Sequence, residues 1–274
     1  MGFHLGPTEQ AAFGQEGFLF PFSVLTAQEV AAARRCIEDF ERDLGGPLPK
    51  ELRHKPHLCS RTIDEIIRMP KIVDRIESLL GPDILCWETA LFIKEPGDAA
   101  YVSWHQDAAY WGLEPYEVLT AWVALSPSTR RSGCMRVLPG SHVGEIVPHL
   151  DTFAANNMLS RGQEIQLEVD ESQVVDIELQ AGEMSLHHVM IAHGSDPNTG
   201  DDRRIGLAIR YIPAHVRQVV GTADTATVIR GADRHPYFEA EPRPTGDFTA
   251  DGLEVQRRLR ARRMAVLMRA TGVA

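Results

Sequence analysis

The sequence has few cysteines, and no two of them stand close enough to form a C-x-x-C motif. The four are Cys36, Cys59, Cys86 and Cys134, in a chain of 274 residues. This usage argues against a disulfide framework and against a zinc ribbon, because both need clustered cysteines. We therefore expect a protein of a reducing compartment and predict a cytoplasmic location.

Long apolar runs and an excess of positive charge are also lacking. No apolar stretch approaches the roughly 20 residues that cross a bilayer. The start, MGFHLGPTEQ, has no basic region followed by an apolar run, as a signal peptide would have. The formal net charge of -10 disfavours general binding to nucleic acid or to an acidic membrane. We expect no membrane span and no nucleic-acid partner.

The pattern of the chain changes near residue 83. Before it, apolar residues at helical spacing predict helices, one starting at the capping box of Thr26 and Glu29 and another spanning about 71–80. After it, short apolar or alternating runs separated by turn residues predict many short strands. Such strands favour a sandwich or jelly-roll barrel over repeated βαβ units.

The tail from about 252 to 271 has a helical pattern again, and its arginines are interpreted as a solvated helix face. We expect one domain over residues 1–274, mostly β with flanking helices. Its predicted parts are N-terminal helices at about 8–82, a barrel core at about 83–230 and the C-terminal helix. That last helix is compatible with packing on its own barrel or with a homodimer.

Three residues predict a metal site. His105 and Asp107, inside SWHQDAAYW, stand at i and i+2, and side chains at that spacing share one side of a strand or its extension. His193, in LHHVMIAHGSDPN, supplies a third donor from a distant strand. The His-x-Asp pair alone arises often by chance. Two histidines and one carboxylate with open positions opposite them are diagnostic of non-haem iron(II) oxygenases.

A pair of arginines in DDRRIGLAIRYIP predicts an anion site downstream of His193. An open iron(II) site accepts a bidentate 2-oxo acid and dioxygen, and the far carboxylate of a dicarboxylate such as 2-oxoglutarate needs a partner. A guanidinium offers a permanently charged, bidentate fork. Arg203 and Arg204 point opposite ways in a strand, so only one of them faces the metal.

Six blocks follow one another in a familiar order: WHQD (104–107), AWVAL (121–125), VLPGSH (137–142), AGE (181–183), HGSDPN (193–198) and RRIGLAIRY (203–211). In these blocks, over about residues 85–212, the chain resembles the phytanoyl-CoA dioxygenase family of iron(II)/2-oxoglutarate oxygenases. The N-terminal TEQAAFGQEGFLF is similar to the family's opening helix and strand. The resemblance implies a double-stranded β-helix, a jelly-roll barrel of the cupin-like kind.

The resemblance also implies roles for single residues. It carries the metal triad onto His105, Asp107 and His193, and the cosubstrate arginine onto Arg204. Related halogenases replace the carboxylate ligand by a small residue that leaves room for chloride. The aspartate kept here therefore favours hydroxylation over halogenation.

Three further cosubstrate residues follow from the same resemblance. Ser195 matches a position that helps to hold the far carboxylate, and Trp122 matches an aromatic position near the cosubstrate. Thr120 shares the strand parity of Trp122 and is expected to face inward. Of the two adjacent histidines, His188 is interpreted as a packed group or one that orients a ligand, and His187 is expected to face the opposite way.

The candidates for substrate contact are Tyr110, Trp111, Lys94, His57, Lys55 and Arg210. The basic segment 48–58 is either an exposed loop or the mouth of a pocket that grips an anion. Arg210 shares the parity of Arg204, and a buried arginine needs a partner, such as a substrate carboxylate, phosphate or phosphonate. Tyr110 and Trp111 form a pocket wall or pack in the core.

The predicted function is an iron(II)- and 2-oxoglutarate-dependent dioxygenase. It would use dioxygen to hydroxylate a C–H bond of a small anionic or amphiphilic substrate, with release of succinate and CO2. Desaturation or cyclisation by the same cofactors stays open. A cupin-like metal enzyme that does not use 2-oxoglutarate and a non-catalytic binding module are the competing hypotheses.

Overall fold

The computed structural model describes residues 2–166, 168–220 and 224–269. Its centre is a seven-stranded major sheet in the order β1-β10-β5-β12-β2-β14-β15. The pairs are antiparallel except for β14 with β15. The strands are β1 (Phe18–Ser23), β2 (Ile84–Lys94), β5 (Leu119–Ala124), β10 (Glu183–His188), β12 (Arg204–Pro213), β14 (Asp224–Arg230) and β15 (Phe238–Ala240).

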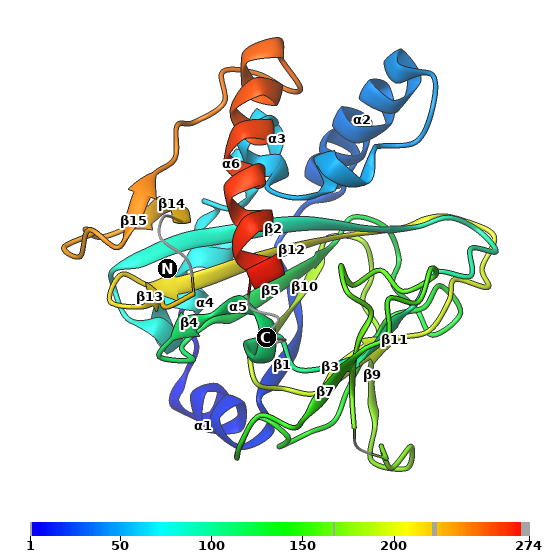
Figure 1. Ribbon diagram of the computed structural model, residues 1–274, viewed down its shortest axis with the longest axis vertical. Helices are drawn as coiled ribbons and strands as arrows, with labels where there is room; N and C mark the ends of the chain where they lie inside the picture. Colours follow the sequence, from blue (N-terminus) through cyan, green and yellow to red (C-terminus); the bar gives the residue numbers. More distant parts are fainter. Residues whose placement is uncertain (1, 167, 221–223, 270–274) are drawn as a thin grey trace.

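A smaller, four-stranded sheet lies on one side of the major sheet (Figure 1). Its order is β3-β11-β6-β9, and two two-stranded ribbons, β13-β4 and β7-β8, extend the β structure. These strands are β3 (Val102–His105), β4 (Leu113–Glu114), β6 (Met135–Val137), β7 (His149–Asp151), β8 (Gln163–Ile165), β9 (Val175–Ile177), β11 (His193–Ser195) and β13 (Arg217–Gln218). The predicted class, mostly β with flanking helices, is confirmed.

The helices α2 and α3 stand on the opposite side of the major sheet (Figure 1). The helical elements are α1 (Pro7–Glu16), α2 (Ala27–Leu44), η1 (Lys50–Arg53), η2 (Pro56–Leu58), α3 (Arg61–Ile66), α4 (Pro70–Leu80), α5 (Ala108–Trp111) and α6 (Ala250–Arg269). None of the helices in the described residues is long and apolar enough to cross a membrane.

The helix ends follow the local signals in the sequence. Thr26 Oγ1 accepts a hydrogen bond from the Glu29 amide at 3.2 Å, and the Glu29 carboxylate accepts one from the Thr26 amide at 2.6 Å, which is a capping box. Helix α2 ends at Gly45, whose φ of 72° lies in the left-handed region that glycine adopts without strain. Helix α6 begins slightly before the predicted start, and residues 270 and 271 of the predicted helix lie outside the described residues.

Strand β12 shows how the major sheet positions the site. Its odd-numbered side chains, from Ile205 to Tyr211, belong to the core that the sheet shares with α2, α3 and α4. Its even-numbered side chains point toward the minor sheet, where Ala208 packs with Trp122 of β5 and Val137 of β6. Because side chains alternate along a strand, Arg204 and Arg210 share this inner side.

Candidate active site

Two paired strands of the minor sheet bring the predicted ligands together. His105 ends β3 and His193 begins β11, and the two residues are direct antiparallel partners. Asp107 has helical backbone angles at the start of α5, so a turn after β3 aims its carboxylate back at the two rings. His105 Nε2 lies 3.3 Å from Asp107 Oδ1, and His193 Nε2 lies 3.9 Å from Asp107 Oδ2. All three groups are buried.

The backbone fixes which nitrogen of each histidine faces the others. His105 Nδ1 lies 2.9 Å from the Ser103 carbonyl oxygen, and His193 Nδ1 lies 3.0 Å from the Ile191 carbonyl oxygen. A carbonyl can only accept a hydrogen bond, so each Nδ1 carries the proton. Each Nε2 then has a free lone pair aimed at the centre of the group, as in a metal-ligating histidine oriented by its second nitrogen.

The charge states also suit a divalent metal. Burial and the nearby His105 together lower the pKa of His193 to about 4. Burial alone would raise the pKa of Asp107, but its close neighbour His105, together with His193 and Arg210, holds it well below its usual range. At neutral pH the group offers one anion and one neutral imidazole that need not lose a proton to bind a cation.

Gln106 braces the loop that carries these ligands. Its side-chain amide donates to the Met190 carbonyl oxygen at 2.7 Å and accepts from the Val147 amide at 2.8 Å. Its own backbone amide donates to His149 Nε2 at 2.9 Å. Gln106, which stands between His105 and Asp107, thus ties the turn before His193 to the same loop.

The predicted cosubstrate residues line a narrow cavity of about 60 Å³ next to the triad. Thr120, Trp122, Ser195 and Arg204 all contribute to its wall. Arg204 is 2% exposed, and its guanidinium carbon lies 5.4 Å from the centroid of the Trp122 ring. Among the described residues, no group accepts a hydrogen bond from Arg204 Nε or pairs with Thr120 Oγ1. These unsatisfied polar atoms suit a polar ligand in the cavity.

Gly206 makes room for this arrangement. A Cβ atom at this position would lie 1.9 Å from Trp122 Cζ2, a separation that no packed side chain tolerates. Glycine therefore lets the indole ring lie flat beside β12, under Arg204. Glycine is required here because the indole ring comes so close to the backbone, and not because the residue adopts a left-handed conformation.

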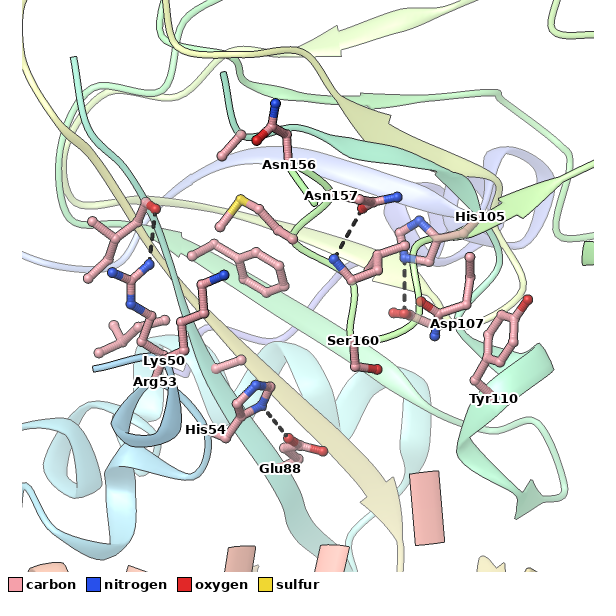
Figure 2. Close-up of a pocket in the computed structure, with 18 of the residues that line it drawn as sticks. Lys50, Arg53, His54, Glu88, His105, Asp107, Tyr110, Asn156, Asn157 and Ser160 are labelled. Atoms are coloured by element: carbon pink, nitrogen blue, oxygen red, sulfur yellow. Dashed lines mark hydrogen bonds and ion pairs between the residues drawn. The ribbon is translucent and has the colours of Figure 1, made fainter. Parts of the chain in front are cut away.

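A larger cavity of about 390 Å³ opens from the triad (Figure 2). Figure 2 shows His105, Asp107 and Tyr110 on one side of it, and Lys50, Arg53, His54 and Glu88 on the other. Asn156, Asn157 and Ser160 come from the loop that follows β7 and cover a third side. Of the predicted substrate residues, Tyr110, Trp111 and Arg210 line this cavity.

The predictions for Lys55 and His57 are wrong. Lys55 is 0% exposed and its ammonium group binds the Glu241 carboxylate, while His57 Nε2 lies 3.0 Å from the same carboxylate. Both side chains point into the protein, away from the cavity. The segment 48–58 reaches the cavity through its other members, Lys50, Arg53 and His54.

Lys94 was predicted to contact the substrate, but the structure places it away from the larger cavity. Its ammonium group donates to Ser195 Oγ at 2.7 Å and to the Asp196 carbonyl oxygen. It does not line the larger cavity. Burial and the nearby charge of Arg204 lower its pKa to about 6. The structure thus places this lysine behind the predicted cosubstrate residues.

Of the two adjacent histidines, His188 is a packed group, which is one of its two interpretations, whereas His187 faces the site instead of away from it. His187 lines the small cavity, with its ring centroid 5.1 Å from that of His193. His188 faces outward against Phe13 and His142, at ring distances of 6.4 and 5.4 Å. Strand parity could have identified His187, because it pairs directly with Thr120, which was expected to face inward.

A second group of potential ligands, His4, Asp74 and Glu77, lies near the N-terminus. Both of its carboxylates already bind Arg230, at 2.7 Å from Asp74 and 2.5 Å from Glu77. Its charges are therefore satisfied by protein, in contrast to the buried triad.

Comparisons of this chain with known proteins agree on one family. The sequence profile of the phytanoyl-CoA dioxygenase (PhyH) family matches residues 13–206. A probable alpha-ketoglutarate-dependent hypophosphite dioxygenase of Stutzerimonas stutzeri is 33% identical over 236 residues, which are 78% of this chain and 80% of that protein. The peroxisomal phytanoyl-CoA dioxygenase of Homo sapiens is 28% identical over 57% of this chain and 48% of its own length, so the chain spans about half of that relative.

A solved structure is similar over nearly the whole chain. The non-heme monooxygenase ThoJ, in its apo form, has a TM-score of 0.84 and 36% sequence identity. The match covers 95% of this chain and 98% of that one. The helices that flank the sheets are therefore shared along with the β core.

Proposed function

This chain belongs to the phytanoyl-CoA dioxygenase family, and on that basis we propose that it hydroxylates a C–H bond of a small anionic substrate. It is an iron(II)- and 2-oxoglutarate-dependent dioxygenase, with dioxygen as oxidant and succinate and CO2 as coproducts. The observation that carries the proposal is the buried His105–Asp107–His193 group with an arginine facing it in one cavity. We also infer that the two sheets form the double-stranded β-helix of the family.

His105, Asp107 and His193 would hold the iron. Their two imidazole nitrogens and one carboxylate oxygen match the donor set of non-haem iron(II) oxygenases, and the tautomers and charges described above leave these atoms ready to coordinate. Iron(II) bound there supplies the activation of dioxygen that is coupled to decarboxylation of 2-oxoglutarate. The chain's own contribution is to fix three ligands on one side, so that the other side stays open.

Arg204 and Ser195 would bind the far carboxylate of 2-oxoglutarate. Arg204 has a buried N–H group without an acceptor among the described residues, and a carboxylate would satisfy it by a charge-assisted hydrogen bond. Lys94 holds Ser195 Oγ from behind at 2.7 Å and adds a second cationic group when protonated. Trp122 and Thr120 complete the wall and exclude water from the cosubstrate.

The larger cavity would bind the substrate. It begins at His105 and Asp107, so a bound molecule can present a C–H bond to the open side of the metal. Hydroxylation is favoured over halogenation because Asp107 occupies the third ligand position. Two relatives are named for hypophosphite and for phytanoyl-CoA. These molecules differ greatly in size, so sequence similarity does not identify the substrate. The volume of about 390 Å³ favours a small molecule or one segment of a larger one.

Anaerobic reconstitution with iron(II) and 2-oxoglutarate tests the proposal. Wild-type protein should give the weak visible charge-transfer band of the chelated cosubstrate. The band should be absent in His193→Ala and should need at least tenfold more 2-oxoglutarate in Arg204→Ala, because a charged hydrogen bond is worth about 1.5–3 kcal/mol.

Arg203→Gln is the matched control. Arg203 is the neighbour of Arg204, but its guanidinium points away and pairs with Glu41 and Glu95, each at 2.6 Å. The band should survive in this variant. Stoichiometric iron binding without any band in the wild type would remove 2-oxoglutarate from the mechanism and favour a cupin-like enzyme that does not use it.

A further inference from the structure

Arg210 lies where the two cavities meet. It is on β12, on the same side of the strand as Arg204, and it contributes to the wall of both the small and the large cavity. Its side chain is 8% exposed. The triad lies beside it, since His105 and Asp107 contribute to the walls of both cavities and His193 to that of the small one.

The guanidinium of Arg210 forms no ion pair or hydrogen bond within the described part of the protein. Across residues 2–166, 168–220 and 224–269, no carboxylate lies within ion-pair distance of it and its Nε has no acceptor. Burying an arginine in this state is costly. By comparison, Arg136 and Arg161, which are equally buried, each bind an aspartate at 3.2 and 2.5 Å. The missing partner is therefore a feature of this position.

Two aromatic rings hold the side chain in place without using its hydrogen-bond donors. The guanidinium carbon lies 4.9 Å from the centroid of Trp111 and 6.0 Å from that of Phe92. Contact with a ring face stabilises a guanidinium, while its N–H groups stay available to the cavity. Trp111 lines the large cavity but not the small one, which places Arg210 toward the substrate side.

We propose that Arg210 binds an oxyanion of the substrate, a carboxylate or a phosphorus oxyanion, directly beside the metal position. The inference rests on the proposed function and narrows its substrate class. Since the anion is held next to the triad, the oxidised bond lies within a few bonds of it. A substrate whose only charges are remote from the reacting carbon, such as a long acyl thioester, does not fit this arrangement.

The first arm of the test measures oxyanion binding on protein loaded with zinc in place of iron, without cosubstrate. The probes are acetate and methylphosphonate at constant ionic strength, with acetamide as the neutral analogue, and the readout is tryptophan fluorescence. We expect Arg210→Met to weaken binding of both anions by about 10- to 100-fold, the range of a charged hydrogen bond. The oxyanion affinity of Arg210→Lys should lie between those of wild type and Arg210→Met, because lysine keeps the charge but cannot form the paired hydrogen bonds of a guanidinium.

Two controls show that the effect is local. Arg131→Met removes the same charge from an exposed side chain, which pairs with the exposed Asp201, and should leave the affinities within about twofold. The Arg210→Met protein should also melt at a higher temperature than wild type, since it no longer buries an unpaired cation. Equal oxyanion affinity in wild type and Arg210→Met, or no binding of either anion by wild type, would overturn the proposal.

The second arm measures 2-oxoglutarate affinity from the charge-transfer band of the iron(II) protein. Arg210→Met should stay within about threefold of wild type. A loss as large as that of Arg204→Ala would assign Arg210 to the cosubstrate and overturn the substrate role. If the band is absent in wild type, the proposed function fails, but the zinc arm still decides whether Arg210 binds an oxyanion.

Discussion

At the scale of a single residue, the ionisation of Lys94 should make 2-oxoglutarate binding depend on pH. Its ammonium group faces Ser195 and Asp196 after β11, Arg204 on β12, Cys134 before β6 and Asp98 after β2. Burial and the charge of Arg204 lower its pKa to about 6, so the free protein holds it neutral at pH 8. A bound dianion would favour the charged form, and its pKa would then rise.

We therefore predict that 2-oxoglutarate binding takes up a proton. At pH 8 the uptake should approach about one proton for each molecule bound, and it should vanish below pH 6, where Lys94 is already charged. Affinity should be highest below pH 6 and should fall as the pH rises, by at most about tenfold for each pH unit. Calorimetry in two buffers of different ionisation enthalpy measures the uptake directly.

Lys94→Met should abolish this proton uptake, whereas Lys71→Met, which removes a partly exposed lysine from α4, should leave it unchanged. Uptake that persists in Lys94→Met would show that another group titrates on binding.

At the scale of elements, the segment from η1 to η2 is held by contacts from far along the chain. Glu241 binds Lys55 and His57 and accepts hydrogen bonds from Thr225 at 2.6 Å and Thr227 at 2.7 Å. Gln256 of α6 donates to the Glu51 and His54 carbonyl oxygens at 2.8 and 2.6 Å. These contacts fix the segment whose other side chains line the larger cavity.

Glu241→Gln should destabilise the protein by about 3–5 kcal/mol, because it leaves Lys55 buried without its anion. Burial alone would raise the pKa of Glu241, but the charge of Lys55 and the hydrogen bond from His57 hold it below its ordinary value of 4.5. The contribution is therefore fully present above pH 4.5 and is lost as the pH falls through the lower, folded pKa. Urea unfolding at pH 7 and at pH 3 should show the difference narrowing in acid.

Glu239→Gln is the control for this substitution. Glu239 is two residues away and exposed, and its carboxylate pairs with Arg262 at 2.7 Å, so its loss should cost less than about 1 kcal/mol. Similar losses in the two variants would mean that the buried network does not hold the segment.

Elements with local signals could be predicted from the sequence. The capping box at Thr26 and the alternation that puts Arg204 and Arg210 on one side of β12 each depend on neighbours within a few residues. Lys55 and His57 could not be placed, because their burial depends on Glu241, which is remote in sequence and carries no motif.

The triad could be predicted because its residue types and order are distinctive, although its geometry is a property of the whole molecule. His105 and His193 are brought together only by the pairing of β3 with β11, and the cavity beside them is closed by the major sheet. No stretch of sequence indicates the loop of Asn156 and Asn157 that covers the larger cavity, because its position depends on packing against Tyr101 and Ser103.

A metal bound by both β3 and β11 should stabilise the entire fold. A ligand that binds only the folded state adds about 2.7 kcal/mol at 100 times its dissociation constant, and the three donors here come together only in that state. Manganese(II), which tolerates air, should therefore raise the melting temperature of wild type and of His142→Ala, but should have no effect on Asp107→Ala. 2-Oxoglutarate should add a further rise only when the metal is present, because one end of it would chelate the metal while the other meets Arg204. An equal rise from 2-oxoglutarate in metal-free protein would show that the cosubstrate site forms independently of the metal, and that the two sheets are not coupled through it.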